Sequence, residues 1–209
     1  MNGFSFFDNV YYINLAARTD RNLQIRYELD RLEVKANRID AITGENKHLA
    51  FNASQFKALS GAGGDSILIL EDDCVFRSGV SDCHDIITSA TGELSEDWDI
   101  LFLGANIMGS DVMKWEAPLN YSTHLKILVN CWTTHAVAYS RKCIDWIVKN
   151  WNFSEFPIYD EWLRVNVLPY KKCFIVNPMV ADQRPGFSDI WQTQVDYGFF
   201  KQGNERMAI

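Results

Sequence analysis

The run from Leu68 to Phe76, LILEDDCVF, places three consecutive carboxylates directly after a continuous apolar stretch. The residues just before the acids, SILIL at 66–70, are apolar at successive positions. Such a run is typical of a strand that is buried on both faces of a sheet covered by helices. Three adjacent anions repel each other, and burying any one of them unpaired is costly. The sequence therefore predicts a central strand whose end meets a positively charged partner.

Further apolar runs of strand length alternate with helical patterns along the chain. We expect strands at 9–15, 38–42, 66–70, 99–104, 125–131, 135–140 and 171–178, and helices at about 21–32, 54–59, 82–88, 140–151 and 159–168. Thr19 or Asp20 is expected to cap the first helix, and Ser140 is expected to open the fourth. Alternating strands and helices with short links predict an α/β fold with a Rossmann-like, mostly parallel central sheet flanked by helices.

The domain organisation is expected to be simple. The chain has 209 residues and shows no internal repeat, low-complexity tract or linker, so we expect a single domain over 1–209. From Met179 onward the sequence is polar and aromatic with little periodicity, and Pro185-Gly186 marks a turn. The segment from about residue 186 is therefore expected to be partly mobile.

Composition and charge argue against several classes of protein. A net charge of -7 without a long basic run argues against broad binding to nucleic acid, although it leaves a local basic groove open. No apolar stretch approaches the roughly 20 residues of a membrane span, and the N-terminal residues do not resemble a signal peptide. The five cysteines form no C-x-x-C pair, which argues against a zinc site and for free thiols in a cytoplasmic protein.

The acidic strand end suits a hard divalent cation. Ligands of open α/β sheets bind at the carboxyl ends of the strands, and Mg²⁺ or Mn²⁺ takes oxygen ligands there. Alternate residues of an extended segment point the same way, so Glu71 and Asp73 can share one target. Asp72 would then face elsewhere, toward a sugar hydroxyl or a supporting arginine. A solvated acidic turn is the alternative interpretation, and the strongly apolar approach to the acids favours a site.

Two other folds place acids after a strand, and both fit less well. Haloacid-dehalogenase-like phosphatases need a nucleophilic Asp where this chain has Glu71, and they need it on the first strand. Response-regulator receivers carry an acidic pair on their first strand and are much shorter.

Several segments, taken in order, resemble the family 25 glycosyltransferases. The resemblance covers about residues 9–190 and is carried by YINLAARTDRN, AITG, LILEDDCVF, DWDILFLG, HAVAYSRK, YDEWL and NPMVADQRPGFSDI. It implies a GT-A fold and transfer of a sugar, with inversion, from a nucleotide-sugar donor that is usually a UDP-sugar. It also implies a divalent metal, typically Mn²⁺, on Glu71 and Asp73, with Mg²⁺ as the alternative. The hydroxyl acceptor stays open between a glycan, a lipooligosaccharide and a modified nucleobase.

The resemblance also implies roles for individual residues. We expect Asp160, or else Glu161, to take the proton of the acceptor hydroxyl, since inversion needs a base. Arg21 is expected to contact the diphosphate or the base, because a guanidinium fits phosphate in a bidentate fashion. Ile42 and Thr43, with Ala41, are expected to wall the base. The other expected donor contacts are Asn14, Arg18 and Asp72, with His135 on the donor sugar or the metal. Gln183, Ser188 and Asp189 would close over the diphosphate.

The sequence departs from the family pattern in two places. Ser54-Gln55 stands where many relatives have Ser-His, which puts donor contacts there in doubt. No His follows His135, so Asp182, Asp189 or water would have to supply a further metal ligand. A non-catalytic module that binds a nucleotide-sugar or glycan stays an alternative, and a nucleotidyltransferase is a third interpretation.

Overall fold

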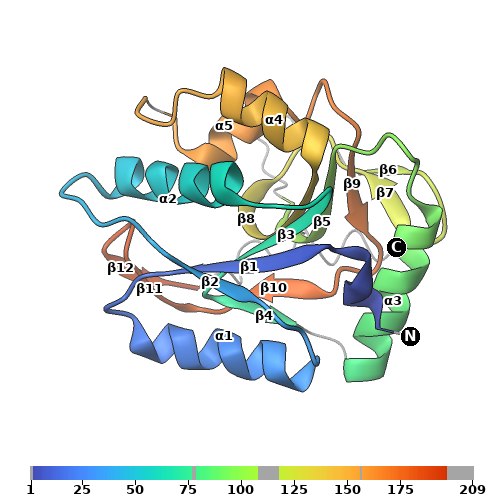
Figure 1. Ribbon diagram of the computed structural model, residues 1–209, viewed down its shortest axis with the longest axis horizontal. Helices are drawn as coiled ribbons and strands as arrows, with labels where there is room; N and C mark the ends of the chain where they lie inside the picture. Colours follow the sequence, from blue (N-terminus) through green and yellow to red (C-terminus); the bar gives the residue numbers. More distant parts are fainter. Residues whose placement is uncertain (1, 77–78, 108–117, 156, 197–209) are drawn as a thin grey trace.

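A central eight-stranded sheet with helices on both faces forms the body of the molecule (Figure 1). The computed structural model describes residues 2–76, 79–107, 118–155 and 157–196. The helices are η1 (Gly3–Phe6), α1 (Thr19–Arg31), α2 (Lys47–Gly61), α3 (Val80–Glu93), α4 (Arg141–Asn150) and α5 (Tyr159–Asn166). The strands are β1 (Asn9–Asn14), β2 (Asn37–Asp40), β3 (Ser66–Glu71), β4 (Cys74–Phe76), β5 (Ile100–Asn106), β6 (Leu119–Asn120), β7 (Leu125–Ile127), β8 (Trp132–Ser140), β9 (Cys173–Val176), β10 (Ala181–Gln183), β11 (Gly186–Ser188) and β12 (Thr193–Val195).

The strands of the central sheet follow the order β2-β1-β3-β8-β5-β9-β7-β6. The strands β2, β1 and β3 pair in parallel, as do β5 and β9. Within the described residues, β7 and β8 run against the other strands of this sheet. The predicted α/β fold with a mostly parallel sheet is therefore confirmed, and the antiparallel insertion of β8 between β3 and β5 is the feature that the sequence did not indicate.

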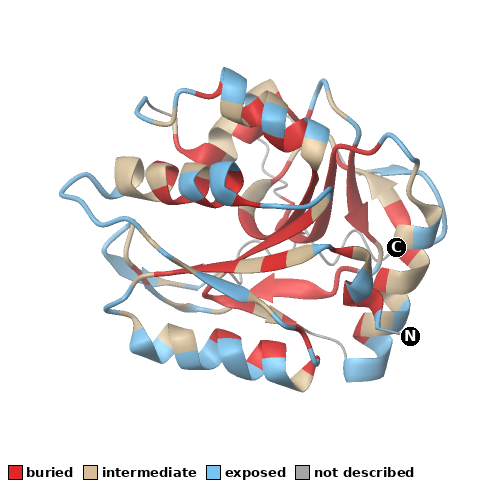
Figure 2. Cartoon of the chain, viewed as in Figure 1, coloured by how far each residue is buried: buried red, intermediate tan, exposed pale blue. Residues whose placement is uncertain are grey.

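The continuous apolar runs form strands whose two faces pack into two separate hydrophobic cores, one on each side of the sheet. In β3, Ile67 and Ile69 pack on the side of α2, α4 and α5, while Leu68 and Leu70 pack on the side of α1 and α3. This alternation follows from the period of two in a strand, so a strand covered on both faces must be apolar at every position. Figure 2 shows the result, since β3, β5, β8 and β9 are buried along most of their length.

The parallel register brings the ends of three strands to one edge of the sheet. Ile13 pairs with Glu71, and Asn14 pairs with Asp40. The residues that follow β1, β2 and β3 therefore emerge side by side, as the carboxyl ends of neighbouring parallel strands must.

The predicted helix starts are confirmed for α4 but not for α1 and α2. Neither Thr19 nor Asp20 caps α1, because the helix already begins at Thr19 after Arg18, which makes no side-chain cap. The capping role of Ser140 is confirmed, since its side chain accepts a hydrogen bond from the Cys143 N–H at the start of α4. The helix expected at 54–59 is the last part of α2, which Asn46 caps.

The C-terminal segment contains more structure than its sequence indicated. Residues from Met179 onward form β10, which pairs with β4, and the β11–β12 hairpin. Of the residues expected to be mobile, 186–196 belong to this hairpin and the short stretch beside it, and 197–209 lie outside the described residues.

Gly104 of β5 marks a very close approach between two layers. A Cβ added there would lie 2.0 Å from the Ala181 carbonyl oxygen and 2.9 Å from His135 Nε2. Because the first neighbour is backbone, we expect Gly104→Ala to lower the free energy of unfolding by about 3 kcal/mol. Urea unfolding checks this, with Gly92→Ala in α3 as the control. An added Cβ at Gly92 meets no atom within 4 Å, so this change should stabilise by up to about 1 kcal/mol. Equal midpoints for the two variants would contradict the prediction.

The cysteine side chains are all buried and free: Cys74, Cys83, Cys131, Cys143 and Cys173. Burial raises the pKa of Cys83 to about 12 and that of Cys143 to about 12, and it raises the pKa of the other three thiols as well. Because the thiolate is the reactive form, we expect negligible labelling of the native protein by a thiol reagent at mildly alkaline pH. Five thiols should react after unfolding in urea. Rapid labelling of the folded protein would contradict this arrangement.

A search of the described helices for one with the length and apolar character of a membrane span finds none.

Candidate active site

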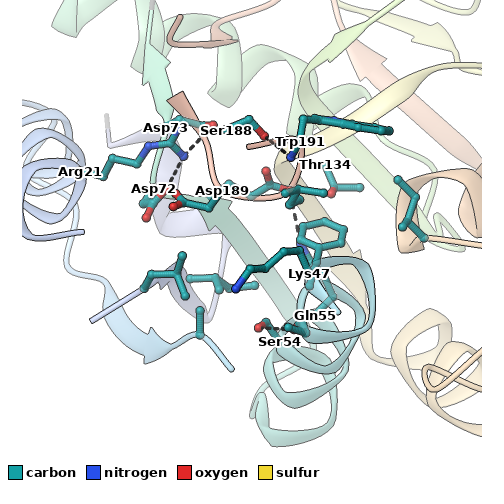
Figure 3. A pocket seen from close by; sticks show the side chains of 18 of the residues that line it. Arg21, Lys47, Ser54, Gln55, Asp72, Asp73, Thr134, Ser188, Asp189 and Trp191 are labelled. Atoms are coloured by element: carbon teal, nitrogen blue, oxygen red, sulfur yellow. Dashed lines mark hydrogen bonds and ion pairs between the residues drawn. The ribbon is translucent and has the colours of Figure 1, made fainter. Parts of the chain in front are cut away.

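A cavity of about 750 Å³ opens at the edge where β1, β2 and β3 end (Figure 3). Its size falls in the range of small-molecule sites, about 300–1,000 Å³. Its lining residues come from 13–21, 41–55, 71–73, 132–134, 158–160 and 183–195, so both halves of the chain contribute. The site is thus built on rigid strand ends and helix starts, with the β11–β12 hairpin along one side.

Glu71 is the last residue of β3, and its carboxylate is held by two side chains. Thr134 Oγ1 donates a hydrogen bond of 2.7 Å to Glu71 Oε1, and Gln55 Nε2 donates one of 3.3 Å to the same oxygen. Burial, together with the nearby Asp73 carboxylate, raises the pKa of Glu71 to about 8. The amide of Gln55 therefore binds directly to the acidic motif, in the place where the family pattern has a histidine.

Arg21 is the positively charged partner that the acidic run required. Its Nη1 lies 3.0 Å from Asp72 Oδ1 and 3.1 Å from Asp73 Oδ2, and its Nη2 donates to the Phe187 carbonyl oxygen at 2.8 Å. The expected contact of Asp72 with a supporting arginine is present, but Asp73 pairs with the same guanidinium, which the alternation of an extended strand did not predict. The extended segment ends at Glu71, and the turn that follows lets both aspartates reach one guanidinium.

Asp72 and Asp73 differ in how many of their carboxylate oxygens have hydrogen-bond partners. Asp72 also accepts a hydrogen bond of 2.7 Å from Asn14 Nδ2, so both of its oxygens are used. Asp73 Oδ2 accepts from Arg21 and, at 3.3 Å, from Gln183 Nε2. Asp73 Oδ1 is buried and has no hydrogen-bond partner among the described residues. Burial raises the pKa of Asp73 to about 6, even though the Arg21 guanidinium lowers it.

The unpartnered oxygen of Asp73 gives a test of whether the residues fit a divalent cation. Mg²⁺ is commonly held by one or two protein carboxylates, with substrate phosphates completing the coordination. Glu71 and Asp73 supply that donor set, and an uncompensated buried carboxylate oxygen is a costly feature that a cation would relieve. Among the described residues no group of three or more His, Cys, Asp or Glu side chains could hold a metal. In the described structure, neither Asp182 nor Asp189 therefore completes such a group with Glu71 and Asp73.

Asp160 lines the cavity from the first turn of α5. Its Oδ1 accepts a hydrogen bond of 3.0 Å from the Glu161 backbone N–H, and the nearby Thr133 backbone N–H also lowers its pKa. Burial raises the pKa of Asp160, and these N–H groups only partly offset the effect. Glu161 does not line the cavity, and its carboxylate lies 3.8 Å from Arg164 on the same helix.

The other residues predicted for the site divide into three groups. Ile42, Thr43, Gln183, Ser188 and Asp189 line the cavity, as does Ala41. Asn14 and Arg18 lie behind it, where Asn14 holds Asp72, and Arg18 pairs with Asp189 at 2.5 Å and with Asp20 at 2.9 Å. His135 is buried beneath the cavity wall and does not line the cavity, so the structure does not place it against a donor sugar.

Several cavity residues were absent from the sequence prediction. Lys47, Phe51, Trp132, Thr134 and Trp191 all line the cavity, and Figure 3 shows the Lys47 side chain extending into it. Lys47 and Phe51 lie in the part of α2 that the sequence did not predict as helix. Trp132 and Thr134 lie at the start of β8, which begins three residues earlier than the strand expected at 135–140.

Comparisons with known proteins bear on the fold. No protein-family model matches this chain, and no curated protein sequence matches it either. One similar solved structure is a glycosyltransferase involved in the glycosylation of the major capsid of PBCV-1, with a TM-score of 0.51 and 11% identity over 95% of this chain and 97% of that chain. A197 from STIV has a TM-score of 0.50 and 10% identity over 90% of this chain and 92% of that chain.

These likenesses show the fold. The chain has a mixed α/β, GT-A-like architecture that it shares with a solved glycosyltransferase, and the predicted fold class is confirmed. Membership of family 25 stays a prediction.

Proposed function

We propose that this chain, with its GT-A-like fold, is a metal-dependent inverting glycosyltransferase that moves a sugar from a nucleotide-sugar, most simply a UDP-sugar, to a hydroxyl acceptor. One observation carries the proposal: the buried carboxyl of Asp73 and the half-buried carboxyls of Glu71 and Asp160 line a single cavity of about 750 Å³. Paired acids with raised pKa values in one cleft are typical of catalytic sites. The acceptor class is a glycan or another hydroxyl compound.

The donor would lie along the edge of β1, β2 and β3. Ala41, Ile42 and Thr43 follow β2 and offer a mostly apolar wall for a base. Arg21 carries the guanidinium nearest to the acidic motif, and it can contact phosphate oxygens without leaving the cavity wall. Ser188 and Asp189 of the hairpin border the same space, so a bound diphosphate would be shielded from water on that side.

Glu71 and Asp73 would hold the divalent cation, Mn²⁺ or Mg²⁺, through oxygen ligands. The chemistry that such an ion supplies is neutralisation of the charge that develops on a departing nucleoside diphosphate. Thr134 and Gln55 keep the Glu71 carboxylate in place, and Gln183 does the same for Asp73.

Asp160 would act as the general base. Its carboxylate takes the proton of the acceptor hydroxyl, the acceptor oxygen forms a bond to the anomeric carbon, and the bond from that carbon to the phosphate oxygen breaks. The nucleoside diphosphate leaves with the electron pair. A base with a raised pKa accepts this proton more readily, and burial of Asp160 provides that rise.

A thermal-stability screen tests the proposed function directly. We expect one UDP-sugar of a panel to raise the unfolding midpoint in the presence of Mn²⁺ and to have little effect with EDTA. At a ligand concentration of 100 Kd the stabilisation is about 2.7 kcal/mol. For a chain of this size that corresponds to a rise of roughly 5–10 °C.

The controls separate binding from turnover. Uridine lacks the diphosphate and should raise the midpoint much less than UDP. Donor binding without release of UDP, to water or to any glycan, would favour the non-catalytic module. No shift with any nucleotide-sugar, with metal present, would overturn the proposed function.

A further inference from the structure

Thr133 has a backbone conformation that a β-branched residue rarely adopts. Its φ is +73°, whereas left-handed conformations are mostly confined to glycine, asparagine and aspartate. Two other described non-glycine residues with positive φ, Glu33 and Gln192, lie in turns, but Thr133 lies inside β8. Strained residues of this kind persist where the surrounding structure over-determines them, and they cluster at functional sites.

The pairing of β8 with β5 is irregular at the same point. Gly104 pairs with Ala136 and Asn106 pairs with Trp132, so four steps along β8 match two along β5. Such a bulge re-aims side chains. In a regular strand Thr133 and Thr134 would point to opposite faces, yet both line the cavity.

The bulge directs two polar groups at the two acids on which the proposed function depends. The Thr133 backbone N–H lies near enough to the Asp160 carboxylate to lower its pKa, and the Thr134 hydroxyl donates a hydrogen bond of 2.7 Å to Glu71. The bulged start of β8 thus contacts both the candidate base, Asp160, and the candidate metal ligand, Glu71.

His135 contacts Thr133 on the side of the bulge that faces away from the cavity. Its Nδ1 lies 3.0 Å from Thr133 Oγ1, and its side chain is only 1% exposed. The ring packs so closely on β5 that a Cβ at Gly104 would lie 2.9 Å from Nε2. The hydroxyl of Thr133 is therefore tied to a ring that cannot move freely.

We propose that Thr133 is a positioning residue: its left-handed conformation, held by the hydrogen bond to His135, sets the placement of Asp160 and Glu71 for sugar transfer. This inference rests on the proposed function for the roles of those two acids. It also gives His135 a place in the site, as a support for Thr133 and not as a contact of the donor sugar.

Two substitutions at Thr133 separate positioning from folding. Glycine adopts positive φ without cost, so Thr133→Gly should fold, but it loses the hydroxyl that fixes the bulge. We expect its kcat for release of UDP from a UDP-sugar, with water or glycan as acceptor, to fall by about 10- to 100-fold, and the donor Kd with Mn²⁺ to rise by a smaller factor because Glu71 is also less well placed. Thr133→Ser keeps the hydroxyl and should stay within about threefold of wild type.

Glu33→Gly is the matched control. Glu33 has a φ of +53° in the turn after α1 and does not line the cavity, so this change relieves similar strain away from the site. Its kcat should equal that of wild type. Hydrogen exchange without ligand gives a second readout, in which residues 130–136 should exchange faster in Thr133→Gly than in Thr133→Ser.

The outcomes are distinguishable. Wild-type kcat in Thr133→Gly, an equal loss in Glu33→Gly, or unchanged exchange at 130–136 would overturn the positioning role alone. If wild-type protein, with metal present, binds no nucleotide-sugar of the panel and releases no nucleoside diphosphate from any of them, the proposed function fails and the positioning role in catalysis falls with it.

Discussion

Replacing Asp160 with asparagine is expected to lower the rate of sugar transfer by about a thousandfold, because general bases contribute about 10²- to 10⁴-fold. Asparagine has the same shape and can still accept the hydrogen bond from the Glu161 N–H, so the site should keep its form. It cannot take the proton of the acceptor hydroxyl. The loss should therefore appear in kcat, with the donor Kd unchanged. Steady-state release of UDP and calorimetric titration of UDP measure the two quantities separately.

The neighbouring acid provides a control for Asp160→Asn. Glu161 occupies the same first turn of α5, but its carboxylate faces Arg164 at 3.8 Å and lies outside the cavity lining. Glu161→Gln should retain kcat within about threefold, as expected for a substitution away from the reacting atoms. If Glu161→Gln lost as much activity as Asp160→Asn, the base would have been assigned to the wrong residue.

Replacing Asp73 with asparagine should remove the metal-dependent part of donor binding. The variant keeps an oxygen for Gln183 but loses the charge of the carboxylate whose Oδ1 is buried without a partner in the described structure. We expect the Kd for UDP in the presence of Mn²⁺ to rise by about 100-fold, which is about 2.7 kcal/mol. Calorimetric titration with Mn²⁺ and with EDTA measures this change, and with EDTA the variant and wild type should bind alike.

Asp72→Asn is the comparison for Asp73→Asn. Both Asp72 oxygens already have partners, Arg21 at 3.0 Å and Asn14 at 2.7 Å, so its carboxylate has less to offer a cation. The Kd for UDP with Mn²⁺ should rise by about tenfold, the low end of the effect of altering a residue that supports a metal ligand. A larger loss in Asp72→Asn than in Asp73→Asn would contradict the choice of Asp73 as a ligand.

The sequence predicted the parts of the fold and site that are encoded by patterns extending over several residues. The strand 66–70 follows from a continuous apolar run and the helix 140–151 from a helical apolar period, and the acidic run at the end of β3 follows from its position. Ile42 and Thr43 lie at the cavity because they follow a parallel strand, and ligands of such sheets bind at the carboxyl ends of the strands.

The features that the sequence did not predict depend on single contacts. The strands β11 and β12 pair only with one another in the described structure. Each has three residues, and a strand of that length is too short to show an alternating apolar pattern. The shared contact of Asp72 and Asp73 with Arg21 depends on the residue at which β3 stops. The burial of His135 and the exposure of Thr134 to the cavity depend on a bulge, which a sequence pattern with a period of two does not show.

The β11–β12 hairpin has a consequence for how such a protein can change over evolutionary time. The central sheet receives its last strand at β9, and the hairpin pairs with no strand of that sheet. It is attached through side chains such as Arg18 and Arg21, yet it supplies Ser188, Asp189 and Trp191 to the cavity. Substitutions in this hairpin could alter which molecules enter the cavity without disturbing strand pairing in the core. A lineage could therefore explore new substrates here at little risk to folding, and related chains should diverge in this segment before they diverge in β3.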